Sequence, residues 1–99
     1  SIQAADYSAT LQYLTAVKAT GTDDADKVLA QMKKTKINDV YAKGGFIRGD
    51  GRMVHDMYLM QVKTPAQATE PWDYYNVVQT FKGEEAWTTK AESKCALWK

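Results

Sequence analysis

One short segment constrains the fold of this chain more than any other, because it is apolar on both of its faces. Residues 57–63 place Tyr58, Met60 and Val62 on one face of an extended strand and Leu59 on the other. A strand that is apolar on both faces usually lies inside a sheet that is covered on both sides. The segment therefore predicts a buried strand that needs a covering layer on each face.

Two predicted helices could supply such layers, and both precede this strand. Apolar residues recur with helical spacing from about Asp6 to Thr20, where Asp6 can cap the first turn and Gly21 suits the end. A second amphipathic segment runs from about Asp24 to Lys34, with acidic residues at its start and lysines at its end, as the helix dipole favours. The two segments predict a helical hairpin or corner.

Strand and turn signals dominate the rest of the chain. Residues 46–48 are a short strand candidate, and Gly49-Asp50-Gly51 follows as a turn. Residues 74–81 alternate again and are expected to pair antiparallel with residues 57–63, across a loop at 64–71 that contains both prolines. Two helices, a short strand and a β-hairpin together predict an α/β chain.

Composition argues against several classes of function. Thirteen basic and twelve acidic side chains nearly cancel, so nucleic-acid binding by phosphate neutralisation has little support. No apolar stretch approaches the roughly 20 residues that span a bilayer, so the chain is not expected to cross a membrane. Hydrophobic residues make up 44% of the chain and charged residues 25%, which argues against disorder.

The apolar surface leaves two interpretations open. Two helices and a small sheet can leave apolar surface that needs a partner outside this chain, and three tryptophans and six tyrosines strengthen that interpretation. Alternatively, the helices cover the sheet and the aromatic side chains fill an ordinary α+β core. Composition alone slightly favours the second interpretation.

Several stretches of sequence are familiar when they are taken in order. The first helical pattern opens with Gln3-Ala-Ala-Asp-Tyr7. The stretch from Gly45 to Lys63 follows and includes Arg48-Gly-Asp-Gly-Arg52 and His55-Asp56. The last two motifs are Pro71-Trp-Asp-Tyr-Tyr75 and Glu92-Ser-Lys-Cys95. Their order and spacing resemble the C-terminal region of type I periplasmic binding proteins, in the branch of ABC transporter substrate-binding proteins for branched-chain amino acids. The last two motifs are similar to a subgroup with an extended C-terminus, some members of which take up aromatic or other small carboxylates.

The resemblance implies that residues 1–99 form a single C-terminal segment of a longer protein with two α/β lobes. Three segments of chain cross between the lobes in that fold. Residues 1–54 would belong to the first lobe, and residues 55–99 to the second lobe and a C-terminal extension.

The resemblance also implies roles for individual residues. Ala4 follows one crossing, and His55 and Asp56 mark the last one, so these three are hinge candidates. Gln3 and Tyr7 lie where a helix N-terminus faces the ligand cleft, and such an end offers N–H donors to a ligand carboxylate. Packing of Tyr7 in a core is an equal alternative.

Nothing in the sequence indicates an enzyme, a cofactor or a metal. His55 and Asp56 are the only histidine–carboxylate neighbours, and adjacent strand residues point to opposite faces. Residues 23–26 lack the glycine and the terminal glutamate of a calcium loop. Cys95 is the single cysteine; in an exported protein it would pair with a cysteine outside this chain.

The function that the resemblance implies is solute capture in the periplasm for an ABC importer. The ligand would be a branched-chain amino acid or a similar small carboxylate, aromatic ones included, and an ABC permease would be the protein partner. Two other interpretations stay open: a stand-alone α+β interaction module, and a ligand-sensing receptor domain of the same fold. The chain by itself is expected to self-associate or exchange strands, since its sheets would lack their central strands.

Overall fold

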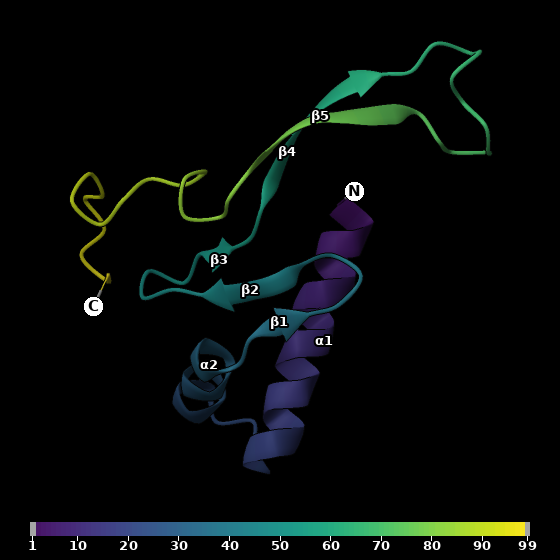
Figure 1. Cartoon of the computed structure of the whole chain (residues 1–99). Coiled ribbons are helices and arrows are strands. Elements are labelled where there is room, and N and C mark those ends of the chain that lie inside the picture. Colours follow the sequence, from purple (N-terminus) through teal and green to yellow (C-terminus); the bar gives the residue numbers. More distant parts are fainter. Residues whose placement is uncertain (1, 99) are drawn as a thin grey trace.

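The computed structural model describes residues 2–98, within which two helices precede five strands (Figure 1). The elements in chain order are α1 (Ile2–Thr20), α2 (Ala25–Lys34), β1 (Ile37–Asn38), β2 (Lys43–Ile47), β3 (Met53–Val54), β4 (Met57–Val62) and β5 (Tyr75–Phe81). Within these residues, neither helix has the length and apolarity that a membrane crossing requires.

Helix α1 is longer than the sequence pattern predicts. It begins at Ile2 rather than after Asp6, so Asp6 lies inside the helix and the predicted cap is wrong. The reason is local, because the intervening Gln-Ala-Ala residues are good helix formers and extend the first turn backwards. The predicted end is confirmed: Gly21 has a φ of 67°, and its N–H donates to the Val17 carbonyl at 2.9 Å.

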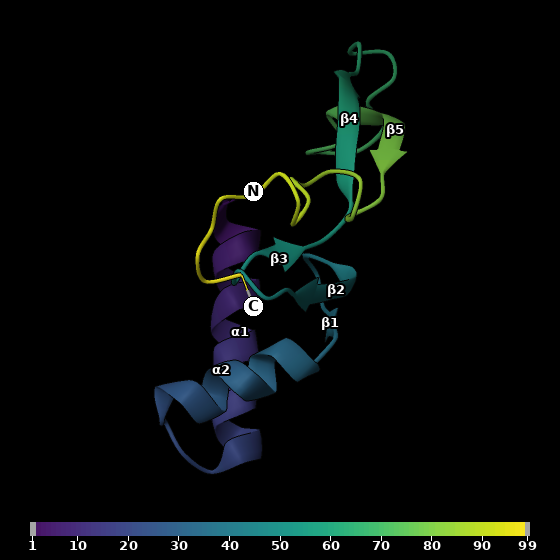
Figure 2. The same ribbon diagram turned by 90° about the vertical axis from the view of Figure 1, so that its left-hand side faces the viewer.

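Helix α2 begins and ends as the sequence predicts. The Asp24 side chain accepts a hydrogen bond from the Lys27 N–H at 3.1 Å, which caps the first turn. Val28, which is 2% exposed, is buried on the inner face of the helix. The helix lies across the C-terminal half of α1, so the pair forms the predicted corner (Figure 2).

A small antiparallel sheet in the order β1-β2-β3 packs beside the two helices. β1 has no clear period in the sequence and was not predicted, but Ile37 pairs with Gly45 of β2. The predicted turn joins β2 to β3: Gly51 has a φ of 86°, and the Arg48 N–H donates to the Arg52 carbonyl at 3.0 Å. We call residues 2–54, which hold these helices and strands, the helical body.

Within residues 2–98, the buried apolar side chains all lie in the helical body. They come from both helices, β1, β3 and the turn between β1 and β2: Ala16, Val28, Ile37, Ala42 and Val54. Ser8 is also buried, and its hydroxyl donates to the Asp39 carboxylate at 2.7 Å. One compact core therefore joins the helices to the small sheet.

The hairpin, residues 57–81, is built as predicted but is not covered as predicted. β4 and β5 pair antiparallel from Met57 opposite Phe81 to Val62 opposite Tyr75, with a bulge between Leu59 and Met60. All six residues of β4 are exposed, and the hairpin projects away from both helices (Figures 1 and 2). The interpretation in which the two helices cover this sheet is therefore wrong.

The dimensions of the chain agree with this open arrangement. Its radius of gyration is 16.7 Å, whereas a compact domain of this size has about 13 Å. Its accessible surface is 7726 Å², against about 5,700 Å² for a folded monomer of the same mass. The chain therefore exposes more surface than a compact domain of its mass.

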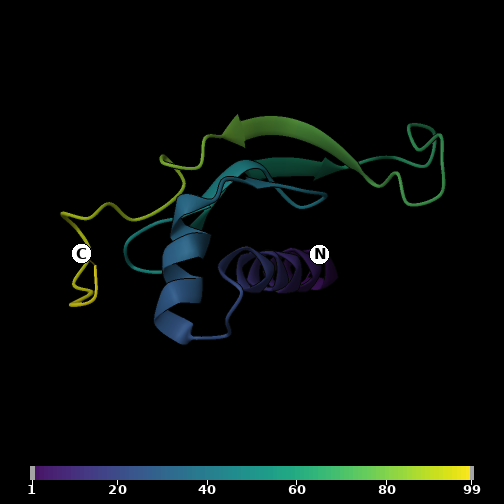
Figure 3. The same cartoon turned by 90° about the horizontal axis from the view of Figure 1, so that it is seen from below.

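After β5 the chain returns to the helical body as a C-terminal tail, residues 82–98 (Figure 1). The tail begins with one turn, in which the Ala86 N–H bonds the Lys82 carbonyl at 3.2 Å. Seen from below, it lies at the opposite end of the molecule from the loop that joins β4 to β5 (Figure 3).

Candidate hinge and solute-binding site

The helical body and the hairpin meet at two residues, His55 and Asp56. They lie between the end of β3 at Val54 and the start of β4 at Met57, and belong to neither strand. The expectation that they are neighbours on one strand, facing opposite sides of a sheet, is therefore wrong. We call His55-Asp56 the junction.

His55 is attached to the helical body. Its Nε2 lies 3.3 Å from the Tyr41 hydroxyl, and the two rings are 5.0 Å apart between centroids. Its Nδ1 lies 2.8 Å from the Asp56 carbonyl oxygen, which can only accept. Nδ1 therefore carries the proton, and in the neutral ring Nε2 accepts from Tyr41. These contacts fix the imidazole against the loop between β1 and β2.

Asp56 is attached to the other side of the junction, where the chain leaves β5. Its carboxylate accepts from the Gly83 N–H at 3.0 Å and pairs with the Lys82 ammonium at 3.1 Å. The hydrogen bond from Lys82 is the largest cause that lowers the pKa of Asp56. Two adjacent residues are thus held by contacts with different segments of the chain, Tyr41 before β2 and Lys82 and Gly83 after β5.

In the described part of the chain, three grooves are lined by His55 of the junction. The two larger ones have volumes of about 590 Å³ and 620 Å³, within the range of small-molecule sites. The first lies between the helical body and the hairpin and is lined by residues 39–43, His55, Asp56, Tyr58 and Lys82. The second lies beside the first turns of α1 and is lined by Ala5, Asp6, Ala9, Tyr41, residues 50–53, His55 and Trp87.

The predicted ligand residues lie close to the second groove but not among its lining residues. Gln3 and Tyr7 are exposed on one face of α1, one helical turn apart, and Tyr7 is 56% exposed. Ala4 is half-buried. The start of α1 borders the groove through Ala5 and other residues of the adjacent face.

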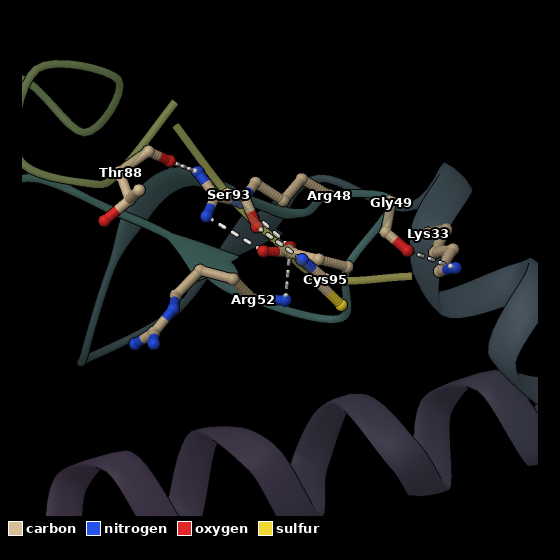
Figure 4. A network of polar contacts seen from close by, with 8 residues as sticks. Lys33, Arg48, Gly49, Arg52, Thr88, Ser93 and Cys95 are labelled. Atoms are coloured by element: carbon tan, nitrogen blue, oxygen red, sulfur yellow. Dashed lines mark hydrogen bonds and ion pairs between the residues drawn. The ribbon is translucent and has the colours of Figure 1, made fainter. Parts of the chain in front are cut away.

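A network around Arg48 joins the turn between β2 and β3 to the tail (Figure 4). The Arg48 guanidinium makes two bonds to the Asp50 carboxylate, at 2.8 and 2.9 Å, and donates to the Thr88 carbonyl at 2.9 Å. The bond from Arg48 holds the pKa of Asp50 below its ordinary value. On the same turn, the Gly49 carbonyl accepts from Lys33 of α2 at 3.2 Å.

Sequence reasoning identified the Arg48–Arg52 turn but missed its partners in the tail. The Thr88 carbonyl is 40 residues from Arg48, and the tail carries no periodic pattern that places it. In the structure, Trp87 marks the place where the tail meets this turn. Its Nε1 is buried without a hydrogen-bond partner among the described residues. Such groups are rare in folded proteins and mark positions where further contacts are expected.

Cys95 and the acidic residues form no site of their own in the part of the chain that the structure describes. The Cys95 thiol is free and exposed, and its backbone N–H donates to the Ser93 hydroxyl at 3.2 Å. Among residues 2–98, no group of three or more histidine, cysteine or acidic side chains is placed to hold a metal ion.

Comparison with known proteins fits this geometry. The sequence profile of the periplasmic binding protein family matches residues 1–69, and the chain belongs to this family. The predicted fold class, an α/β part of a two-lobed type I periplasmic binding protein, is confirmed. The family and the similar structures are solute-binding proteins.

Two solved structures are similar over almost the whole chain. A periplasmic binding protein from Burkholderia mallei is 64% identical, with a TM-score of 0.91 over 98% of this chain and 26% of that one. A branched-chain amino acid ABC transporter periplasmic ligand-binding protein from Burkholderia xenovorans is 46% identical, with a TM-score of 0.86 over 94% of this chain and 25% of that one. The chain thus spans about a quarter of the length of each. No curated protein matches the sequence.

Proposed function

We propose that this chain works as one part of a two-lobed protein that captures a small carboxylate in the periplasm and delivers it to an ABC importer. The favoured ligand is a branched-chain amino acid or a similar small carboxylate, aromatic ones included. The observation that carries the proposal is the junction, which separates the helical body from the hairpin. The chain is also 46% identical to a branched-chain amino acid ABC transporter ligand-binding protein.

In this proposal, residues 1–54 belong to the first lobe and residues 55–99 to the second lobe and its C-terminal extension. The attachments of the junction support the division, because His55 bonds Tyr41 while Asp56 bonds Lys82. Bending between two such residues is how hinged proteins close around a ligand. Ala4 would lie at a second crossing, at the start of α1.

Capture needs no covalent chemistry, so we assign no catalytic residue and no cofactor. Binding affinity would come from hydrogen bonds that converge on the ligand and from apolar burial as the lobes exclude water. The first turn of α1 would offer N–H groups to a ligand carboxylate. Gln3 and Tyr7 on the adjacent exposed face would contact the rest of the ligand once the opposite lobe closes.

The test uses the full-length protein, in which this chain would be about one quarter of the length. Titration calorimetry with leucine, isoleucine, valine and benzoate should give saturable one-to-one binding of at least one of them. The heat capacity change should be negative, since closure buries apolar surface. Failure of all four to bind at millimolar concentration would refute the branched-chain amino acids and benzoate as ligands.

The role of Tyr7 has a matched control on the same helix. Tyr7→Ala should weaken ligand binding more than it lowers the melting temperature, because its side chain is exposed and supports little of the fold. Tyr13→Ala removes a ring that is also about half exposed (45%) and lies further from the helix start; it should leave affinity unchanged. A large loss of stability with unaltered affinity for Tyr7→Ala would assign that residue to packing.

Cys95 would form a disulfide with a cysteine elsewhere in the full-length protein, as an exported protein permits. Its exposed position leaves the thiol accessible to such a partner. Labelling the denatured full-length protein with a maleimide should modify Cys95 only after reduction. Equal labelling with and without reductant would exclude the disulfide.

The exposed hairpin also favours a second candidate function, a stand-alone interaction module. Size-exclusion chromatography of the 99-residue chain separates the two. A part of a two-lobed protein should self-associate or exchange strands, because two strands with apolar faces seek further strands. A monodisperse monomer that keeps its helices would favour the module.

A further inference from the structure

The C-terminal tail leaves the hairpin, passes the junction and packs on the helical body. At its start, Gly83 lies so close to the end of β3 that an added Cβ would be 2.8 Å from the Val54 Cγ1 atom and 3.1 Å from the His55 carbonyl. Only a residue without a side chain fits this approach. The tail therefore already contacts the helical body at its second residue.

Trp87 then packs directly on the junction. Its ring meets the His55 imidazole edge to face, with 5.7 Å between centroids. The Arg52 guanidinium lies on the Trp87 ring, 4.6 Å from its centroid. Trp87 thus contacts both the turn between β2 and β3 and one of the two residues about which the chain would bend.

A second attachment follows eleven residues later, at Trp98. The Arg48 guanidinium lies 4.0 Å from the centroid of the Trp98 ring and also donates to the Thr88 carbonyl at 2.9 Å. The two bonds from Arg48 to Asp50 fix the plane of the guanidinium within its own turn. Each tryptophan of the tail therefore has one arginine of the same turn as its partner.

We infer that residues 82–98 are an interlobe strap that limits rotation at the junction. This inference rests on the proposed function, because it takes the helical body and the hairpin to belong to different lobes. The strap is covalently continuous with β5 and is held to the helical body at Trp87 and Trp98. A rotation between His55 and Asp56 must stretch the strap or detach these rings.

Interlobe distances in the ligand-free, full-length protein test the strap. Nitroxide labels carried by p-acetylphenylalanine at Lys27, on α2, and at Ala66, in the hairpin loop, leave the cysteines untouched. Pulsed electron resonance should give a narrow distance distribution for the unmodified strap. Trp98→Ala and Arg48→Ala should each widen it, with the ratio of detached to attached conformers rising about two- to fivefold for each lost cation–π contact.

Matched variants make each outcome decisive. Lys90→Ala alters an exposed side chain of the tail and should leave the distribution unchanged. Trp98→Ala keeps the Arg48–Asp50 pair, so its result stands even where Arg48→Ala unfolds the turn. A distribution that stays narrow in Trp98→Ala overturns the strap. Because the measurement uses no ligand, its failure is separate from failure to bind a solute.

Discussion

The helical body and the hairpin are similarly rich in apolar side chains, yet among residues 2–98 the fully buried ones all lie in the helical body. Val28 and Ile37 in the helical body are each 2% exposed, whereas Tyr58, Val77 and Val78 in the hairpin are 52%, 57% and 58% exposed. An apolar pattern in the sequence predicts that an element needs a covering layer. The tertiary structure decides whether the same chain provides that layer.

The physical reason is the number of layers in each region. In the helical body, two crossed helices and a three-stranded sheet pack together around one core, which buries Ala16, Val28, Ile37, Ala42 and Val54. The hairpin has two strands and no layer on either face. A lone two-stranded ribbon is marginally stable in water, so the hairpin needs neighbouring strands or helices from the rest of a two-lobed protein.

The largest expected effect comes from placing a charge on the hairpin. In the full-length protein, Met60→Asp should lower the free energy of unfolding by about 3–5 kcal/mol, as an uncompensated buried charge does. Met60 is 49% exposed in this chain, so the loss reports burial by the rest of the protein. Urea denaturation measures it. Ala30→Asp, on the outer face of α2, is the control and should stay within about 0.5 kcal/mol. If Met60→Asp and Ala30→Asp both lower the free energy of unfolding by a similarly small amount, the hairpin is not buried by the rest of the protein.

A cavity in the helical body should have the next largest effect. Ile37→Ala removes a fully enclosed side chain and should lower the free energy of unfolding by about 2–4 kcal/mol. Val40→Ala alters a neighbouring side chain that is 80% exposed, and its effect should be within about 0.5 kcal/mol. If the two variants unfold alike, the core does not lie where the structure places it.

Between the two regions, Gly83→Ala tests how closely the tail approaches β3. The added methyl group would overlap Val54, so the expected destabilisation is about 1–3 kcal/mol. Thermal denaturation measures the effect. Glu84→Ala, which changes the exposed next residue, serves as the control. A neutral Gly83→Ala would mean that the tail is free to move away from the helical body.

The smallest effect concerns pH and the helical body. The Ser8 hydroxyl is the largest cause that lowers the pKa of Asp39 from its ordinary value of 3.8. Because the folded pKa lies below the unfolded one, the carboxylate stabilises the fold above about pH 4, and this stabilisation is lost as the pH falls through the folded pKa. Asp39→Asn should therefore flatten the fall in melting temperature in acid. Glu70→Gln, in the hairpin loop, should leave that fall unchanged.

Local signals predicted much of the fold. Asp24 and Gly21 gave the start of α2 and the end of α1, since capping and left-handed backbone depend on residues within one turn. The antiparallel pairing of residues 57–63 with residues 74–81 followed from two alternating segments and a loop, whereas its register came from the structure. β1 was missed because two residues carry no period, and Asp6 was misplaced because the residues before it are equally helical.

The candidate site was predictable only in part. His55 and Asp56 were identified through a resemblance, but their opposite attachments to Tyr41 and Lys82 depend on contacts 14 and 26 residues apart. The grooves beside the junction have no local signature either, since their walls come from α1, loops and the tail.

The sequence by itself determined the helices, the hairpin and the need of the hairpin for cover, because these depend on side-chain periodicity and on neighbours within a few residues. Only the tertiary structure decided that the helices cover one another rather than the hairpin, and that Trp87 and Trp98 return to Arg52 and Arg48. Those outcomes depend on which surfaces that are distant in sequence pack together. The free energy of that packing depends on all the layers of the fold and cannot be assigned to any one segment.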